Sequence, residues 1–258
     1  MGIRINTNVE AINAQRNLSA TAVAFGKSVE KLSSGLRINR AADDAAGLVI
    51  SEKLRGQVRG LNQAVRNAQD GISMIQFGEG ALNEVHSMLQ RIRELAVQEA
   101  NGTNDATSKA AIDAEATSLG AAIADIASNT KFNGVSLLAA GSVVFQTGAD
   151  AAQTFTLTTT ALAAAPTAAG GIALVDAAID AVSTQRGAFG AAQNTLEHTV
   201  NSLSVAAENM AASESRIRDL DVAAEMVNFT KSQILQQAGT AILAQANSAP
   251  QNILTLLR

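Results

Sequence analysis

Two segments near opposite ends of the sequence have long heptad patterns of apolar residues. In the C-terminal half every seventh residue is apolar: Val175, Val182, Phe189, Leu196, Leu203, Met210 and Ile217. In the N-terminal half the spacing runs through Leu54, Val58, Leu61, Val65, Ala68, Ile72 and Ile75, and after one phase change through Leu82, Val85, Leu89, Ile92 and Ala96. A 3-4 spacing held this long is typical of helices that pack along other helices. We therefore expect the polypeptide to turn round and return, with its two ends lying together.

The composition agrees with long helices and excludes several classes of function. Hydrophobic residues make up 47% of the sequence, Trp and Tyr are absent, and there are only 2 Pro. The absence of Cys excludes disulfides, thiolate metal sites and a Cys nucleophile. A formal net charge of -4 and few aromatic rings argue against nucleic-acid binding. No cleavable signal peptide is visible at the N-terminus, and no apolar run of about 18 residues predicts insertion into a membrane.

The local signals predict an almost entirely helical protein. Residues 6–32 form a first helix that Gly35 ends, 36–47 form a polar connector, and 48–100 form a long helix. A shorter helix follows Asn104 or Asp105 as its cap, and 172–218 form the long C-terminal helix.

The middle of the sequence differs in character. Residues 142–147 and 154–159 are rich in β-branched residues and are separated by a turn-like loop, which predicts a β-hairpin near 142–159. The fold class expected is mainly α, an elongated coiled-coil or helical-bundle rod with this small hairpin.

The last segment, from about residue 224, ends in Leu256 and Leu257. Free ends of a polypeptide normally fray in water, so this apolar end predicts an interface with a partner.

Candidate chemistry is sparse. Asp43 and Asp44 are adjacent, have no anchored His or Lys partner, and are better interpreted as capping the long helix than as an acid–base pair. His86 and His198 lack a third metal ligand, and no nucleophile, phosphate-loop or dinucleotide motif occurs. The sequence therefore predicts no enzyme, no cofactor and no metal site.

One surface segment has two interpretations. Arg91, Glu94, Leu95 and Gln98 are expected to project away from the seam that contains Ile92. They form either a solvated helix face with intrahelical pairs or a recognition surface with an Arg and a Leu anchor.

Many blocks in order resemble bacterial flagellin. They occupy 5–8, 32–39, 41–47, 93–98 and 132–135 in the N-terminal half, and 233–240, 243–247 and 250–252 in the C-terminal half. The likeness implies an inner coiled coil of 1–34 with 224–258, connectors at 35–47 and 219–223, and an outer helical domain at 48–218. Larger members insert variable domains between the hairpin and the last long helices, whereas this protein has only a short linker there. It therefore resembles a short-form flagellin.

The resemblance implies a structural subunit that self-assembles into a helical tube for motility. It also implies extracellular localisation in the flagellar filament, after export by the flagellar type III system without a cleaved signal peptide. The implied partners are further copies of the same protein, an export chaperone, and the filament cap and junction proteins. The assembly coiled coil would contain Val9, Ile12, Leu18, Phe25, Val29, Leu32, Val227, Ile234, Ile242, Leu256 and Leu257. The alternative within the superfamily is a hook–filament junction protein, which usually lacks so full a block at 233–247.

The resemblance also gives a role to the surface segment. Gln90, Arg91, Leu95 and Gln98, with Glu115 from the next helix, match the surface that vertebrate Toll-like receptor 5 reads in some flagellins. We expect this patch to be recognised by that receptor.

Overall fold

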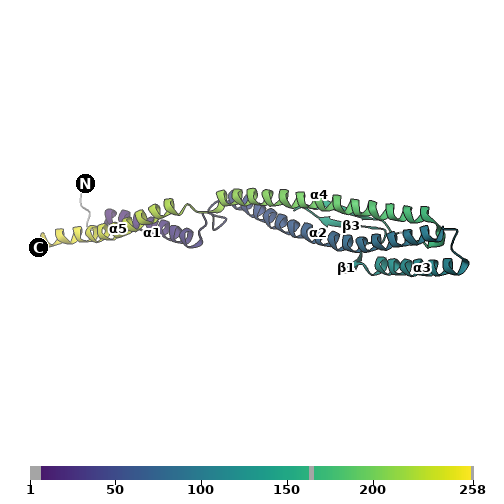
Figure 1. Ribbon diagram of the computed structural model, residues 1–258. Coiled ribbons are helices and arrows are strands. Elements are labelled where there is room, and N and C mark those ends of the chain that lie inside the picture. Colours follow the sequence, from purple (N-terminus) through teal and green to yellow (C-terminus); the bar gives the residue numbers. More distant parts are fainter. Residues whose placement is uncertain (1–6, 163–165, 257–258) are drawn as a thin grey trace. The chain divides into compact units, whose positions relative to one another are not determined.

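The computed structural model describes residues 7–162 and 166–256, with the backbone alone for 250–256 (Figure 1). The protein divides into two units, one made of 1–55 with 210–258 and the other of 56–209. The first unit therefore draws on both ends of the sequence and the second on the segment between them. No helix in the described part has a stretch long and apolar enough to cross a bilayer.

The protein is mainly helical, as predicted. Its helices are α1 (Val9–Ser34), α2 (Ala45–Glu99), α3 (Ala106–Asn129), α4 (Ile172–Arg218) and α5 (Val222–Leu256), with a short 3-10 turn η1 (Ala168–Gly170). Its strands are β1 (Lys131–Phe132), β2 (Val135–Ser136), β3 (Gly141–Gln146) and β4 (Thr154–Thr159). Helix α2 begins at Ala45 rather than at 48, because the Asp44 carboxylate accepts a hydrogen bond from Gly47 N at 2.8 Å and caps it.

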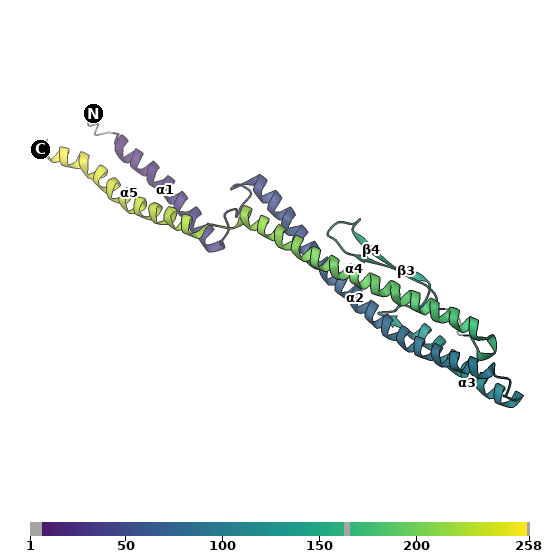
Figure 2. The same ribbon diagram turned by 45° about the horizontal axis from the view of Figure 1, so that its top comes forward.

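The core of the 56–209 unit lies between α2 and α4, which run side by side in both views (Figure 1 and Figure 2). The predicted heptad of α4 is confirmed here, since Val175, Val182, Phe189 and Leu196 are all buried. On α2, Ile75 and Leu82 on either side of the phase change are also buried, and the helix passes through it unbroken. The apolar seam therefore holds the outgoing and returning helices together.

The predicted hairpin is confirmed as the antiparallel pair β3–β4, with Phe145 opposite Phe155. It packs on α2 through the Asn67 side-chain amide, which donates to Gln146 O at 3.1 Å. Its far end is held by Gln185 of α4, whose buried Oε1 accepts from Thr160 N at 3.3 Å and from Thr160 Oγ1 at 2.6 Å.

A tight turn within 132–135 joins a second, shorter pair, β1–β2. Asn133 and Gly134 both have positive φ, 48° and 84°, as a type I′ turn requires. Phe132, on the first strand, meets Phe77 of α2 with ring centroids 6.3 Å apart.

In the other unit, α1 and α5 pair along their length. Phe25 stacks on Phe229 with ring centroids 5.0 Å apart, and Leu18 lies over Gly239, where a Cβ would come within 3.1 Å of Leu18 Cδ1. Gly35 ends α1 in the left-handed conformation (φ 71°), with its N–H donating to Lys31 O at 2.8 Å. The helix stop predicted at this glycine is thus confirmed.

The two connector segments are clasped by backbone hydrogen bonds. Arg37 N donates to Arg218 O at 2.7 Å, and Leu220 N donates to Gly35 O at 3.0 Å. The Arg37 guanidinium donates from Nε (3.1 Å) and Nη2 (2.6 Å) to Ile217 O, which is one of the carbonyls left without a helical partner at the end of α4. The guanidinium therefore caps the helix end as well as joining the segments.

Asp43 stabilises the bend beside this clasp. Its Oδ2 accepts from Arg40 N at 3.0 Å and from Asn39 N at 3.2 Å. These backbone hydrogen bonds, chiefly that from Arg40, lower the pKa of the Asp43 carboxyl. Asp44 caps α2 as predicted, whereas Asp43 holds the connector instead of the helix.

Two glycines of α2 offer a direct test of this packing. A Cβ at Gly78 would stand 2.8 Å from Cε2 of the buried Phe189, whereas a Cβ at Gly80 would meet nothing within 4 Å. We expect Gly78→Ala to lower the free energy of unfolding by about 1–3 kcal/mol through overpacking. Gly80→Ala should raise it by up to about 1 kcal/mol, because Ala favours the helix. Urea unfolding followed by circular dichroism measures both, and Gly78→Ala matching or exceeding Gly80→Ala would contradict the packing described.

Candidate assembly and recognition surfaces

The residues predicted for the assembly coiled coil lie on two different faces of the α1–α5 pair. Leu18 and Phe25 are half-buried between the helices, and Leu32 is also half-buried. The remaining described members face solvent with exposed fractions from 42% to 68%: Val9, Ile12, Val29, Val227, Ile234 and Ile242. Leu257 lies outside the described residues, and only the backbone of Leu256 is described. Pairing of α1 with α5 thus leaves an apolar surface uncovered.

Helix α5 has two apolar faces rather than one. The side toward α1 holds Phe229 and Gly239, whereas Val227, at 68% exposed, and Ile234 point elsewhere. The set that the resemblance implied for this helix therefore includes Val227, Ile234 and Ile242, which form the outward stripe of α5. It does not include Phe229 or Gly239, which meet α1.

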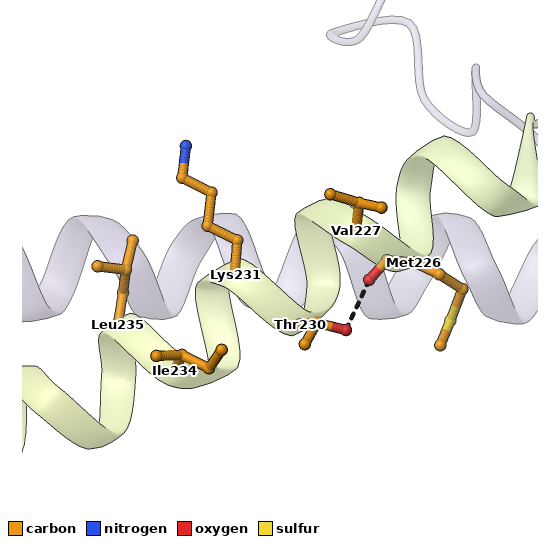
Figure 3. Close-up of a pocket in the computed structure, with 6 residues that line it drawn as sticks. All are labelled: Met226, Val227, Thr230, Lys231, Ile234 and Leu235. Carbon is orange, nitrogen blue, oxygen red and sulfur yellow. Dashed lines mark hydrogen bonds between the residues drawn. The ribbon is translucent and has the colours of Figure 1, made fainter.

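The outward stripe of α5 borders a shallow groove of about 530 Å³ (Figure 3). Its lining residues are Met226, Val227, Thr230, Lys231, Ile234 and Leu235. The Thr230 hydroxyl donates to Met226 O at 2.8 Å, so its polar group is satisfied within the helix. Lys231 brings the charge to this otherwise apolar lining.

Sequence reasoning missed Met226 and Leu235 in this groove. Both are nearly half exposed, at 45% and 48%. They stand one residue from Val227 and Ile234, so they widen the stripe sideways and fall outside a one-residue-per-turn pattern. A helical projection that scores the width of the apolar arc would have found them.

The predicted recognition patch is centred on an arginine that bridges two helices. Arg91 of α2 donates to Glu115 of α3 from Nε at 3.0 Å and from Nη2 at 2.9 Å, and its Nη1 donates to Glu94 at 3.0 Å. Hydrogen bonds from Arg91 to Glu94 first, and to Glu115 second, raise the pKa of its guanidinium. The guanidinium is therefore held in one place as a permanent cation.

The flanking members of the patch are exposed and lie on the same helix. Gln90 Nε2 lies 3.0 Å from Nε2 of His86, one turn earlier. At the other end, the Gln98 carbonyl accepts from Asn101 N at 3.2 Å and from the Asn104 side-chain amide. Arg91 and Glu115 are thus brought together across α2 and α3, and Gln98 is exposed two turns further along α2. Gln90, in contrast, lines the groove between α2 and α4.

The expectation that Leu95 lies on this surface is wrong. Its exposed fraction is 1%, and it belongs to the same buried cluster as Ile112 and Ala116 of α3. The heptad pattern assigned one buried face to α2, the face toward α4. Because α3 covers a second face of α2, a leucine outside the predicted seam is also buried.

A second groove, of about 680 Å³, lies beside the patch between α2 and α4. Arg93 Nε donates to Asp176 Oδ1 at 2.6 Å across it, and this pair raises the pKa of the Arg93 guanidinium. No sequence pattern predicts this pair, because the partners are far apart along the polypeptide and become neighbours only through helix pairing.

Comparison with known proteins places this architecture in one family. The model of the bacterial flagellin N-terminal helical region matches residues 5–143, and that of the C-terminal helical region matches residues 172–257. Only 144–171 lie between the two matches, so this protein has the two helical regions without an inserted domain.

Curated relatives match along almost the whole sequence. Flagellin of Bacillus subtilis is 47% identical over 304 residues, covering 99% of this chain and 100% of its own. Flagellin of Halalkalibacterium halodurans is 50% identical over 270 residues, covering 98% and 99%. The flagellar filament 33 kDa core protein of Treponema phagedenis is 47% identical over 284 residues, covering 98% and 99%. The chain therefore belongs to the bacterial flagellins, the non-enzymatic structural subunits of the extracellular filament used for motility.

Proposed function

We propose that this flagellin polymerises by burying the outward apolar residues of α1 and α5 against neighbouring subunits. The observation that carries the proposal is the solvent exposure of Val227, Ile234 and Ile242 on a helix whose other face is already paired. Full burial of one aliphatic residue contributes about 1.5–3 kcal/mol, so these positions provide a strong drive for association.

This proposal assigns each part of the subunit to a region of the filament. Residues 1–34 with 224–258 form the inner coiled coil of the filament, residues 35–47 and 219–223 are the connectors, and 48–218 form the outer helical domain. Support comes from the end of α1 at Ser34, the clasp between Arg37 and Arg218, and the start of α5 at Val222. A non-closing contact between unlike faces of identical subunits produces an open helical polymer.

The same apolar residues would be covered by partner proteins before and during assembly. An export chaperone would cover the α5 stripe until the subunit leaves through the flagellar type III system. The filament cap and the junction proteins would meet the same terminal helices at the two ends of the polymer. The breadth of the exposed apolar surface supports a protein that covers it, because Met226 and Leu235 widen the stripe of Val227 and Ile234.

A triple variant of the outward stripe tests the assembly proposal. Val227→Ser, Ile234→Ser and Ile242→Ser together should raise the critical concentration for filament growth at least about a hundredfold, because each position loses its apolar burial in the polymer. The matched control has Gln233→Ser, Thr240→Ser and Ala244→Ser at exposed positions of the same helix, which the helical period places on a different side from Ile234. Sedimentation after seeding measures the unpolymerised fraction at each total concentration.

Circular dichroism of both variants separates assembly from folding. The helical content should match that of the unaltered monomer, since the three residues are exposed in it. Normal filament growth by the stripe variant, at the concentration where the control grows, would refute the proposed interface.

We also propose that Toll-like receptor 5 binds the patch of Gln90, Arg91, Gln98 and Glu115. The cross-helix hydrogen bonds from Arg91 to Glu115 support this, because they hold a planar cation in a fixed position before binding. Leu95 takes part from beneath, where its burial fixes α3 against α2 and so sets the distance between Arg91 and Glu115.

Removal of the central guanidinium should weaken the receptor complex. Arg91→Ala is expected to raise the Kd for the receptor ectodomain about tenfold or more, the effect of losing a central arginine anchor. Arg66→Ala makes the same charge change on an exposed residue of α2 outside the patch and should leave the Kd unchanged. Surface plasmon resonance on immobilised receptor measures both, and equal affinities for the two variants would remove Arg91 from the binding site.

A further inference from the structure

Asn is followed by Gly at two positions in the sequence, Asn101–Gly102 and Asn133–Gly134. Glycine offers the least hindered backbone nitrogen for attack on the preceding side-chain amide. The two sites lie in different backbone environments, which makes them chemically unequal. We propose that Asn101 is a site of spontaneous deamidation in this protein and that the fold protects Asn133.

The reaction is an intramolecular exchange of one amide for another. The backbone nitrogen of Gly102 attacks Cγ of Asn101, the new bond between them closes a five-membered succinimide, and the bond from Cγ to Nδ2 breaks. The Nδ2 nitrogen leaves as ammonia, taking up the proton lost from the Gly102 N–H through solvent. Water then opens the ring at either carbonyl, which leaves aspartate or isoaspartate and adds one negative charge.

The loop between α2 and α3 meets the requirements for this reaction. Asn101 and Gly102 are both exposed, and a Cβ at Gly102 would meet nothing within 4 Å. The Asn101 Oδ1 accepts a long hydrogen bond from Thr103 N at 3.4 Å. That donor draws electron density from Cγ and stabilises the oxyanion that forms when the nitrogen attacks.

The turn between β1 and β2 holds Asn133 in a backbone conformation that keeps the Gly134 nitrogen away from its side-chain amide. Its φ of 48° places it in the left-handed region, where ψ is also positive. Rotation about the Cα–C bond then sets Cβ roughly opposite the following nitrogen, so the Gly134 nitrogen faces away from Cγ. Closing the ring would require this bond to turn, and the pairing of Phe132 with Val135 opposes the rotation.

The position of Asn101 makes the modification consequential for the neighbouring surface. It follows the C-terminal end of α2, where a new carboxylate opposes the helix dipole and lies close in sequence to Glu99 and Asp105. Its backbone N–H donates to the carbonyl of Gln98, a member of the recognition patch. Deamidation of Asn101 is independent of receptor binding, since it depends on the chemistry of the loop alone.

The experiment is peptide mapping by mass spectrometry of the purified monomer after days in mildly alkaline buffer at physiological temperature. Conversion at Asn101 should exceed conversion at Asn133 at least about tenfold, which corresponds to an added barrier of about 1.4 kcal/mol at the hairpin. In concentrated urea the two sites should react at similar rates, because both are then flanked by the same glycine chemistry. Isoaspartyl methyltransferase identifies the isoaspartate product.

Gly102→Ala supplies the matched variant. Gly102 is not among the described glycines with positive φ, so alanine fits without strain and should leave the circular dichroism spectrum unchanged. The added methyl group should slow deamidation at Asn101 at least about tenfold and leave Asn133 unaffected. Equal rates at the two sites in the folded protein, a faster Asn133, or an unreactive Asn101 would each overturn the proposal.

Discussion

Burial of apolar seams between segments from opposite ends of the polypeptide is the constraint on which the structure depends. Helices α2 and α4 are separated by more than seventy residues of sequence, yet Ile75, Leu82, Phe189 and Leu196 share one buried cluster. With few aromatic rings to fill space, close approach must replace bulk, and glycines such as Gly78 allow it at Phe189. The hairpin and α3 add further cover to these helices but do not substitute for the seam.

The α1–α5 pair is also held together by apolar burial, but part of its apolar surface stays exposed. Phe25, Phe229, Leu18 and Gly239 satisfy one face, whereas the residues around Val227 remain in water. A monomer that buried all of its apolar surface would lack a hydrophobic driving force for polymerisation. The exposed stripe is the surface that we propose to be buried when subunits polymerise. The clasp through Arg37 joins the segment after α1 to the end of α4, since its N–H donates to Arg218 O and its guanidinium to Ile217 O.

Long-range periodicity made much of this fold predictable from the sequence. The heptad of α4 identified Val175 and Phe189 as core, and the β-rich runs located β3 and β4. Gly35 predicted the end of α1 because few other residues accept its positive φ. These features depend on local chemistry or on a repeated pattern, both of which are present in a single sequence.

The features that the sequence did not predict are those set by which helix covers which face of its neighbour. Leu95 is buried because α3 folds back onto α2, and nothing in the spacing of α2 specifies that contact. The Arg93–Asp176 pair and the Arg91–Glu115 bridge likewise arise from tertiary placement. For α5, the residues implied by the resemblance include exposed ones such as Val227 and leave out Phe229, which meets α1, because the sequence alone does not say which neighbour covers which face.

Apolar surface on the terminal helices, left exposed in the monomer, is proposed here to drive polymerisation. Negative-stain electron microscopy of seeded monomer, beside a truncated protein lacking residues 240–258, is the sharpest test of that drive. Long helical filaments are expected from the full-length protein and none from the truncated one, at equal concentration. Filaments of equal length and number from both proteins would contradict this account. The surface that drives polymerisation would then have to lie in the 56–209 unit.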